Sequence, residues 1–160
     1  MDGDVVACFG CISIDVRWAL LHMVCRQPKG ECDLPKVDVA VVEDDESVRE
    51  AMRHLLRLLG YAVASFTSAE EFLKSDHLGD TACLITDVHL PGMSGVELQN
   101  RLIGAGHRIP IIFVTAFPEE AIRARVLGDG ALAYLSKPLQ EQSLISCLDQ
   151  ALKRAQQGSA

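Results

Sequence analysis

The segment Val37-Asp38-Val39-Ala40-Val41-Val42-Glu43-Asp44-Asp45 places a run rich in β-branched residues directly before three acidic residues. Continuous apolar runs of this length are typical of strands in a parallel sheet, because such a sheet is buried on both faces. The pattern recurs, and the sequence predicts five strands at residues 37–42, 61–66, 81–86, 109–114 and 131–136.

Between the strands the apolar residues recur at helical spacing. One amphipathic stretch ends at Gly60, a residue favoured just after a helix, and its apolar positions are Val48, Met52, Leu55, Leu56 and Leu59. Pro118 at the first helical position predicts a helix over 118–128, and an apolar stripe predicts another over 140–156.

Two further helices are indicated by capping boxes of the form S-x-x-E. Ser68 with Glu71 opens a helix over 68–76, and Ser94 with Glu97 opens one over 94–105. The alternation of five strands with five helices predicts one α/β domain with a doubly wound parallel sheet. In such sheets a ligand binds outside the carboxyl ends of the strands, where the strand order reverses.

Length and composition limit the function. The chain has 160 residues, 49% hydrophobic and 23% charged, which fits one globular domain and excludes a disordered chain. Its 22 acidic and 15 basic residues give a net charge of −7, which argues against direct binding of nucleic acid. The acidic start Met1-Asp2-Gly3-Asp4 and the lack of a long apolar stretch argue against secretion and membrane insertion, so we expect a cytoplasmic protein.

Residues 1–36 lack this periodicity and are expected to form a disordered or loosely packed N-terminal extension before a domain at 37–157, with a tail at 158–160. Two alternatives stay open for the extension. One is a zinc or redox site, for which the spacing is poor, formed by Cys8, Cys11, Cys25 and Cys32. The other is that translation begins nearer Met23.

Polar residues follow four of the predicted strands. Glu43, Asp44 and Asp45 follow the first strand and Asp87 follows the third. If these strands are neighbours, their carboxylates repel one another unless a cation lies between them, and Mg²⁺ is the ion that suits a few carboxylates and a phosphate. Thr115 and Lys137 at the ends of the last two strands add a hydroxyl and an ammonium group. Together these groups indicate a phosphoryl-transfer site.

In these residues the sequence resembles the receiver domain of bacterial two-component response regulators, and its FixJ-type subgroup best. The resemblance covers residues 37 to about 155 and rests on four motifs: Val41-Val42-Glu43-Asp44-Asp45-Glu46-Ser47-Val48-Arg49, Ile85-Thr86-Asp87-Val88-His89-Leu90-Pro91-Gly92-Met93-Ser94-Gly95, Val114-Thr115-Ala116 and Ser136-Lys137-Pro138. It implies a flavodoxin-like sheet of five parallel strands in the order 2-1-3-4-5 with five helices.

The resemblance also implies a role for each site residue. Asp87 is the nucleophile that a phosphohistidine phosphorylates, with Thr115 and Lys137 binding the phosphoryl oxygens. Mg²⁺ is the cofactor, and its ligands are Asp87, Asp44, Glu43 through water and the backbone carbonyl of His89. The imidazole of His89 either modulates hydrolysis of the phosphoaspartate or faces solvent.

The resemblance also bears on Tyr134 and on the Lys137–Pro138 bond, whereas it leaves the role of Asp45 open. Tyr134 is the aromatic switch residue, with plain packing as its alternative, and the Lys137–Pro138 bond is expected to be cis. Asp45 is a third acid whose role stays open, with helix capping alone as the simpler interpretation.

The function implied is that of a phosphoacceptor in a two-component system, not an enzyme. Its upstream partner would be a histidine kinase or a phosphotransfer protein. A downstream protein, or a second copy of the chain on phosphorylation, would bind the face formed by residues 118–128, 131–136 and 140–156. No helix-turn-helix segment follows Arg154, so the chain is expected to be a stand-alone receiver. Two alternatives remain: the detached regulatory half of a FixJ-type transcription factor, and a metal-dependent phosphohydrolase, which would need D-x-D instead of adjacent acids.

Overall fold

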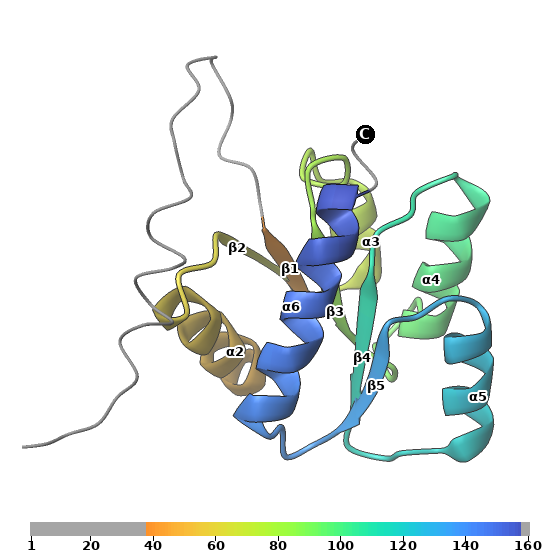
Figure 1. Ribbon diagram of the computed structural model, residues 1–160. Helices are drawn as coiled ribbons and strands as arrows, with labels where there is room; N and C mark the ends of the chain where they lie inside the picture. Colours follow the sequence, from red (N-terminus) through yellow and green to blue (C-terminus); the bar gives the residue numbers. More distant parts are fainter. Residues whose placement is uncertain (1–37, 158–160) are drawn as a thin grey trace, which may run out of the picture. The chain divides into compact units, whose positions relative to one another are not determined.

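Strands and helices alternate through residues 38–157, the part of the chain that the computed structural model describes (Figure 1). The elements are β1 (Val39–Val42), α2 (Glu46–Leu58), β2 (Val63–Phe66), α3 (Ala69–Leu73), β3 (Cys83–Asp87), α4 (Gly95–Gly104), β4 (Ile111–Thr115), α5 (Glu120–Gly128), β5 (Ala133–Ser136) and α6 (Glu141–Gln157). The expected extension at 1–36, with its four cysteines, and the tail at 158–160 lie outside these residues.

The five strands form one parallel sheet in the order β2-β1-β3-β4-β5. β1 lies between β2 and β3, so that Val41 is in register with Ser65 on one side and with Ile85 on the other. The chain moves from β1 outward in one direction to β2 and then crosses over to β3 on the opposite side. The α/β class, the strand order and the five helices expected from the sequence are confirmed.

Alternate residues of each strand pack on opposite faces of the sheet. In β1, Val39 and Val41 pack with residues of α2 and α6, whereas Ala40 and Val42 pack with residues of α3, α4 and α5. Figure 1 shows α2 and α6 in front of the sheet and α4 and α5 on its other side. Because both faces are covered, β1, β3 and β4 are buried along their whole lengths, and each large aliphatic side chain there stabilises the fold by ~1.5–3 kcal/mol.

Side chains and one glycine define the helix ends. Asp45 caps α2, since its carboxylate accepts a hydrogen bond from the Val48 N–H at 3.1 Å. At the other end Gly60 has a φ of +89°, and its N–H donates to the Arg57 carbonyl. Both halves of the expected capping box are present at the start of α4, between Ser94 and Glu97.

The start of α3 satisfies half of the capping box expected there. Ser68 accepts a hydrogen bond from the Glu71 N–H, but the Glu71 carboxylate accepts from Thr67 instead of the Ser68 N–H. The helix ends at Leu73, before the expected residue 76.

The strands begin about two residues later than expected from the sequence. Thr81 belongs to the preceding turn, because both its N–H and its hydroxyl donate to the His77 carbonyl. β3 and β4 also end one residue later than expected, so Asp87 and Thr115 are their last residues instead of the first residues after them.

The prediction that Pro118 starts a helix is wrong by two residues. Glu119 is the N-cap of α5 in an extended conformation, and the helix begins at Glu120. The Glu119 N–H, which has no partner within the helix, donates to the Tyr134 hydroxyl. Among the described residues, no helix is both long enough and apolar enough to cross a membrane.

Candidate functional site

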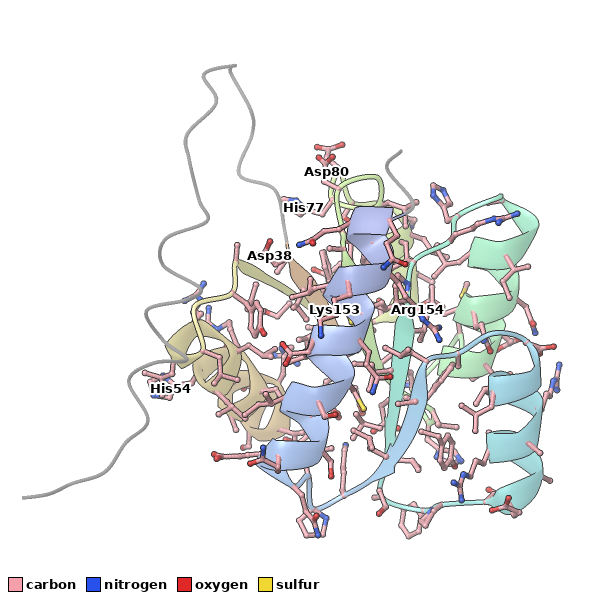
Figure 2. The ribbon with its side chains drawn as sticks, in the orientation of Figure 1. Asp38, His54, His77, Asp80, Lys153 and Arg154 are labelled. Atoms are coloured by element: carbon pink, nitrogen blue, oxygen red, sulfur yellow. The ribbon has the colours of Figure 1, made fainter. Side chains whose placement is uncertain are left out.

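The carboxyl ends of four strands bring the candidate residues to one edge of the sheet. Glu43 and Asp44 follow β1, Asp87 and Thr115 end β3 and β4, and Lys137 follows β5. This edge is at the bottom of the view in Figure 2, whereas the labelled Asp38, His77 and Asp80 lie near the opposite, amino-terminal edge. The strand order reverses between β1 and β3, so the acidic residues lie where a doubly wound sheet binds its ligand.

Lys137 joins two buried carboxylates. Its Nζ donates to Oε2 of Glu43 and to Oδ2 of Asp87, both at 2.8 Å. Glu43 is 1% exposed and Asp87 is 7% exposed, and the Lys137–Pro138 bond that follows is cis, as expected. Of the residues described, Glu43, Asp44 and Asp87 form the group that could hold a metal ion, with carboxylate oxygens that lie within 4.8 Å of one another. The Lys137 ammonium thus pairs with two of the three carboxylates, and one positive charge stands against three acidic groups.

The protonation of this cluster reflects burial and mutual interaction. Burial raises the pKa of the Glu43 carboxyl above its usual value, and Asp87 adds to this effect, although the hydrogen bond and charge of Lys137 oppose it. Burial would by itself lower the pKa of Lys137, but the hydrogen bonds and charges of Asp87 and Glu43 outweigh it and raise that pKa. Lys137 is therefore a cation at neutral pH.

Arg49 holds the backbone that carries the acidic residues. Its Nη1 donates to the carbonyl of Glu43 at 2.8 Å and to that of Asp44 at 3.3 Å. Asp45 is outside the group of three carboxylates, and its side chain serves as the cap of α2. The contact that Asp45 makes is thus the helix cap expected in the simpler interpretation of this residue.

The loop after β3 orients the Asp87 carboxylate. The His89 N–H donates to Oδ1 of Asp87 at 2.8 Å, so each oxygen of this carboxylate accepts a hydrogen bond. Gly95 packs against the same strand end, because a Cβ on this residue would lie 2.2 Å from the Asp87 carbonyl oxygen. A side chain at position 95 would therefore displace the backbone of Asp87.

Thr115 ends β4 and Tyr134 lies near the start of the neighbouring β5, and neither forms a hydrogen bond with the carboxylates. The fully buried Thr115 accepts a hydrogen bond from the Phe117 N–H at 3.1 Å, and its Oγ1 lies 3.4 Å from Nδ1 of His89. Tyr134 is partly buried and its hydroxyl accepts a hydrogen bond from the Glu119 N–H at 3.1 Å. The His89 imidazole is exposed and faces Thr115 and Glu119.

Several contacts at the site were missed by the sequence reasoning. Arg49 was part of a recognised motif, and its place one turn into the helix after the acidic residues could have suggested its role. Gly95 also belongs to a recognised motif, but its close approach to Asp87 depends on how α4 packs against β3. Nothing in the sequence pattern singled out Glu119, whose part in the site depends on the path of the loop before α5.

Comparisons with known proteins identify the family of the chain. The family model for the response regulator receiver domain matches residues 39–149. Nodulation protein W of Bradyrhizobium diazoefficiens is 40% identical over 119 residues, which are 74% of this chain and 52% of that protein. The transcriptional regulatory protein FixJ of Azorhizobium caulinodans is 36% identical over 121 residues, 75% of this chain and 57% of that protein.

Solved structures show the same likeness. The response regulator StyR superimposes with a TM-score of 0.72 at 39% identity, covering 78% of this chain and 63% of that one. The structure titled FixJ-N superimposes with a TM-score of 0.66 at 29% identity, covering 75% of this chain and 96% of that one. The chain spans about half the length of the curated relatives that it matches. It belongs to the receiver domain family of two-component response regulators, in the FixJ-type subgroup.

Proposed function

We propose that Asp87 accepts a phosphoryl group from a phosphohistidine of a histidine kinase or phosphotransfer protein. The observation that carries this proposal is the environment of one carboxylate. Asp87 lies at the carboxyl edge of the sheet, receives hydrogen bonds from Lys137 Nζ and the His89 N–H, and has two further acids beside it. In the transfer, an Asp87 oxygen forms a bond to phosphorus, the phosphorus–nitrogen bond breaks, and its electron pair stays with the histidine nitrogen.

The residues around Asp87 suit the charges that develop during this transfer. Lys137 is held within hydrogen-bonding distance of Asp87 and would follow the negative charge onto the phosphoryl oxygens. Thr115 ends the adjacent strand with its hydroxyl at the same edge, and would donate to a phosphoryl oxygen after leaving its present partners. We regard the domain as a phosphoacceptor that assists its own phosphorylation and dephosphorylation.

The three carboxylates fit a hard divalent cation. Glu43, Asp44 and Asp87 offer oxygens within 4.8 Å of one another, and the single ammonium of Lys137 leaves their charge incompletely neutralised. Asp44 and Asp87 would bind Mg²⁺ directly, Glu43 would act through water, and the His89 carbonyl would complete the protein ligands. When bound, the ion would offset the charge that the phosphoryl group brings to the site.

Phosphorylation would be read on the face formed by α5, β5 and α6. Tyr134 lies in β5, and its hydroxyl meets the loop that leads from Thr115 into α5. A change at Thr115 would therefore reach Tyr134 and this face, where a downstream protein or a second copy of the chain would bind. We also propose that the receiver domain spans residues 37–157 and that the protein is cytoplasmic.

The test is the intact mass of the chain after incubation with Mg²⁺ and acetyl phosphate. We expect one phosphoryl group on the wild type, none on Asp87→Asn and none in EDTA. Asp76→Asn, which removes an exposed carboxylate after α3, is the matched control and should be modified like the wild type. An unmodified wild type would refute the proposal.

A second candidate is the regulatory half of a FixJ-type transcription factor. It is favoured by coverage, since the matched segments make up 52% of nodulation protein W and 57% of the FixJ protein. Sequencing the gene beyond the codon for Ala160 would distinguish a stand-alone receiver from such a half. An adjoining helix-turn-helix segment would favour the second candidate.

A further inference from the structure

Glu119 is linked to both residues of the proposed switch, to Tyr134 directly and to Thr115 through His89. Its backbone N–H donates to the Tyr134 hydroxyl at 3.1 Å. Its carboxylate oxygen Oε1 lies 3.8 Å from Nε2 of His89, and Nδ1 of the same ring lies 3.4 Å from Oγ1 of Thr115. Polar contacts therefore run from Thr115 through His89 and Glu119 to Tyr134. The middle one joins the loops that follow β3 and β4.

A single tautomer of His89 suits both of its contacts. With the proton on Nε2, the ring presents an N–H toward the Glu119 carboxylate and leaves Nδ1 as an acceptor. The Thr115 hydroxyl then has two acceptors within reach, Nδ1 of His89 at 3.4 Å and the Phe117 carbonyl at 3.3 Å. The ring of Phe117 packs edge-on against this imidazole, with centroids 6.4 Å apart. The imidazole is thus restrained by a carboxylate at one edge and an aromatic ring beside it, although 49% of its side-chain surface is exposed.

We propose that His89 and Glu119 are positioning residues that hold Thr115 and Tyr134 in their unphosphorylated arrangement. This inference rests on the proposed phosphorylation of Asp87. To donate to a phosphoryl oxygen, the Thr115 hydroxyl must leave both His89 and the Phe117 carbonyl, so the contact with His89 stabilises the unphosphorylated arrangement alone. Through Glu119, the same contact holds the loop that binds the Tyr134 hydroxyl.

The expected size of the effect follows from exposure. The side chains of His89 and Glu119 are 49% and 57% exposed, and contacts between such groups bias an equilibrium by roughly two- to five-fold. Removal of either side chain should shift the protein toward the phosphorylated arrangement by this factor. Removal of both should add little, because the two residues act through one series of contacts.

The experiment measures the affinity of the full chain for beryllofluoride, a phosphoryl mimic that binds a carboxylate, in Mg²⁺ by fluorine NMR. We expect His89→Ala and Glu119→Ala each to tighten binding roughly two- to five-fold. The double variant should match the single ones. The controls are His54→Ala, on the outer surface of α2 in Figure 2, and Glu120→Ala, the neighbouring exposed carboxylate, and both should bind like the wild type.

A conservative variant separates positioning from general loosening of the loop. Asn at position 89 places an amide oxygen near the place of Nδ1 but cannot reach Glu119, so in His89→Asn the substitution Glu119→Ala should have no further effect. Unchanged or weaker affinity in both single variants, or additive effects in the double variant, would overturn the inference. A wild type that binds no beryllofluoride would instead overturn the proposed function.

Discussion

The ammonium nitrogen of Lys137 lies 2.8 Å from Oδ2 of Asp87, although 50 residues separate the two in the chain. The same nitrogen lies 2.8 Å from Oε2 of Glu43. A cation is thus shared between a carboxylate after β1 and one at the end of β3. Without it, two largely buried carboxylates would face each other, so Lys137 contributes to the stability of the domain as well as to the proposed chemistry.

Replacing Lys137 with Met keeps the aliphatic stem and removes the charge. We expect Lys137→Met to lower the free energy of unfolding by ~1–3 kcal/mol in EDTA, because buried carboxylates lose their hydrogen-bond donor. Urea unfolding measures this change. Lys153→Met, on the exposed surface of α6 in Figure 2, is the matched control and should differ little from the wild type. Equal stabilities of the two variants would contradict the proposed role of the shared cation.

Glu43 makes the stability of the domain depend on pH, because burial raises its pKa. The pKa of the Glu43 carboxyl is 4.5 in the unfolded chain and is raised by folding. The folded chain therefore binds the carboxyl proton more tightly than the unfolded chain does. The contribution of Glu43 to stability is therefore lost as the pH rises from about 4.5 through the raised pKa of the folded state.

Glu43→Gln should accordingly gain stability relative to the wild type as the pH rises from about 4.5 to 7, measured by urea unfolding in EDTA. Glu46→Gln removes an exposed carboxylate three residues away and corrects for the loss of one charge. If the difference between Glu43→Gln and the wild type were constant over this range, the raised pKa would be wrong.

The fold class could be predicted from the periodicity of the sequence, and the convergence of Glu43, Asp87 and Lys137 follows from the fold. Parallel strands end at a common edge, so acids after β1 and β3 and Lys137 after β5 had to converge once the strand order was known. The order itself came from the resemblance, because the alternation of strands and helices is compatible with more than one doubly wound order.

The contacts between loops could not be predicted in this way. Pro118 suits the first position of a helix, but Glu119 is extended and α5 starts at Glu120. The Glu119 N–H bonds to the hydroxyl of Tyr134, a residue 15 positions away. The place of the His89 imidazole between Thr115 and Glu119 likewise depends on how two loops lie in space. No local pattern encodes such contacts, since each joins segments that are distant in the chain.

Thr115→Val tests whether the hydroxyl couples phosphorylation to Tyr134. Val has nearly the same shape and fills the buried site, so the fold and the Asp87 nucleophile should be kept. We expect the variant to accept a phosphoryl group from acetyl phosphate but to show no change in the NMR signals of the Tyr134 ring on phosphorylation. A change as large as that of the wild type would show that Thr115 does not transmit the signal.

Residues 36–160 should fold and accept phosphoryl without the segment before them. Within the described residues, helices cover both faces of the sheet, and each face carries its own hydrophobic core cluster. The fragment should match the full chain in urea midpoint and m-value. A clear decrease in both would show that the N-terminal segment belongs to the cooperative fold.

Gly95→Ala tests the close approach of α4 to the phosphoacceptor strand. A Cβ at this position would lie 2.2 Å from the Asp87 carbonyl oxygen and 3.3 Å from the Phe113 ring, so the helix or the strand end must move. We expect a loss of ~1–3 kcal/mol in the free energy of unfolding, as for an overpacked core, and slower phosphorylation of Asp87.

The same helix supplies the control for this prediction. A Cβ on Gly104 would meet nothing within 4 Å, and Ala is the better helix former by up to about 1 kcal/mol. Gly104→Ala should therefore equal or exceed the wild type in stability and should be phosphorylated at the wild-type rate. If Gly95→Ala behaved like Gly104→Ala in both measurements, α4 could not pack against Asp87 as closely as it does here.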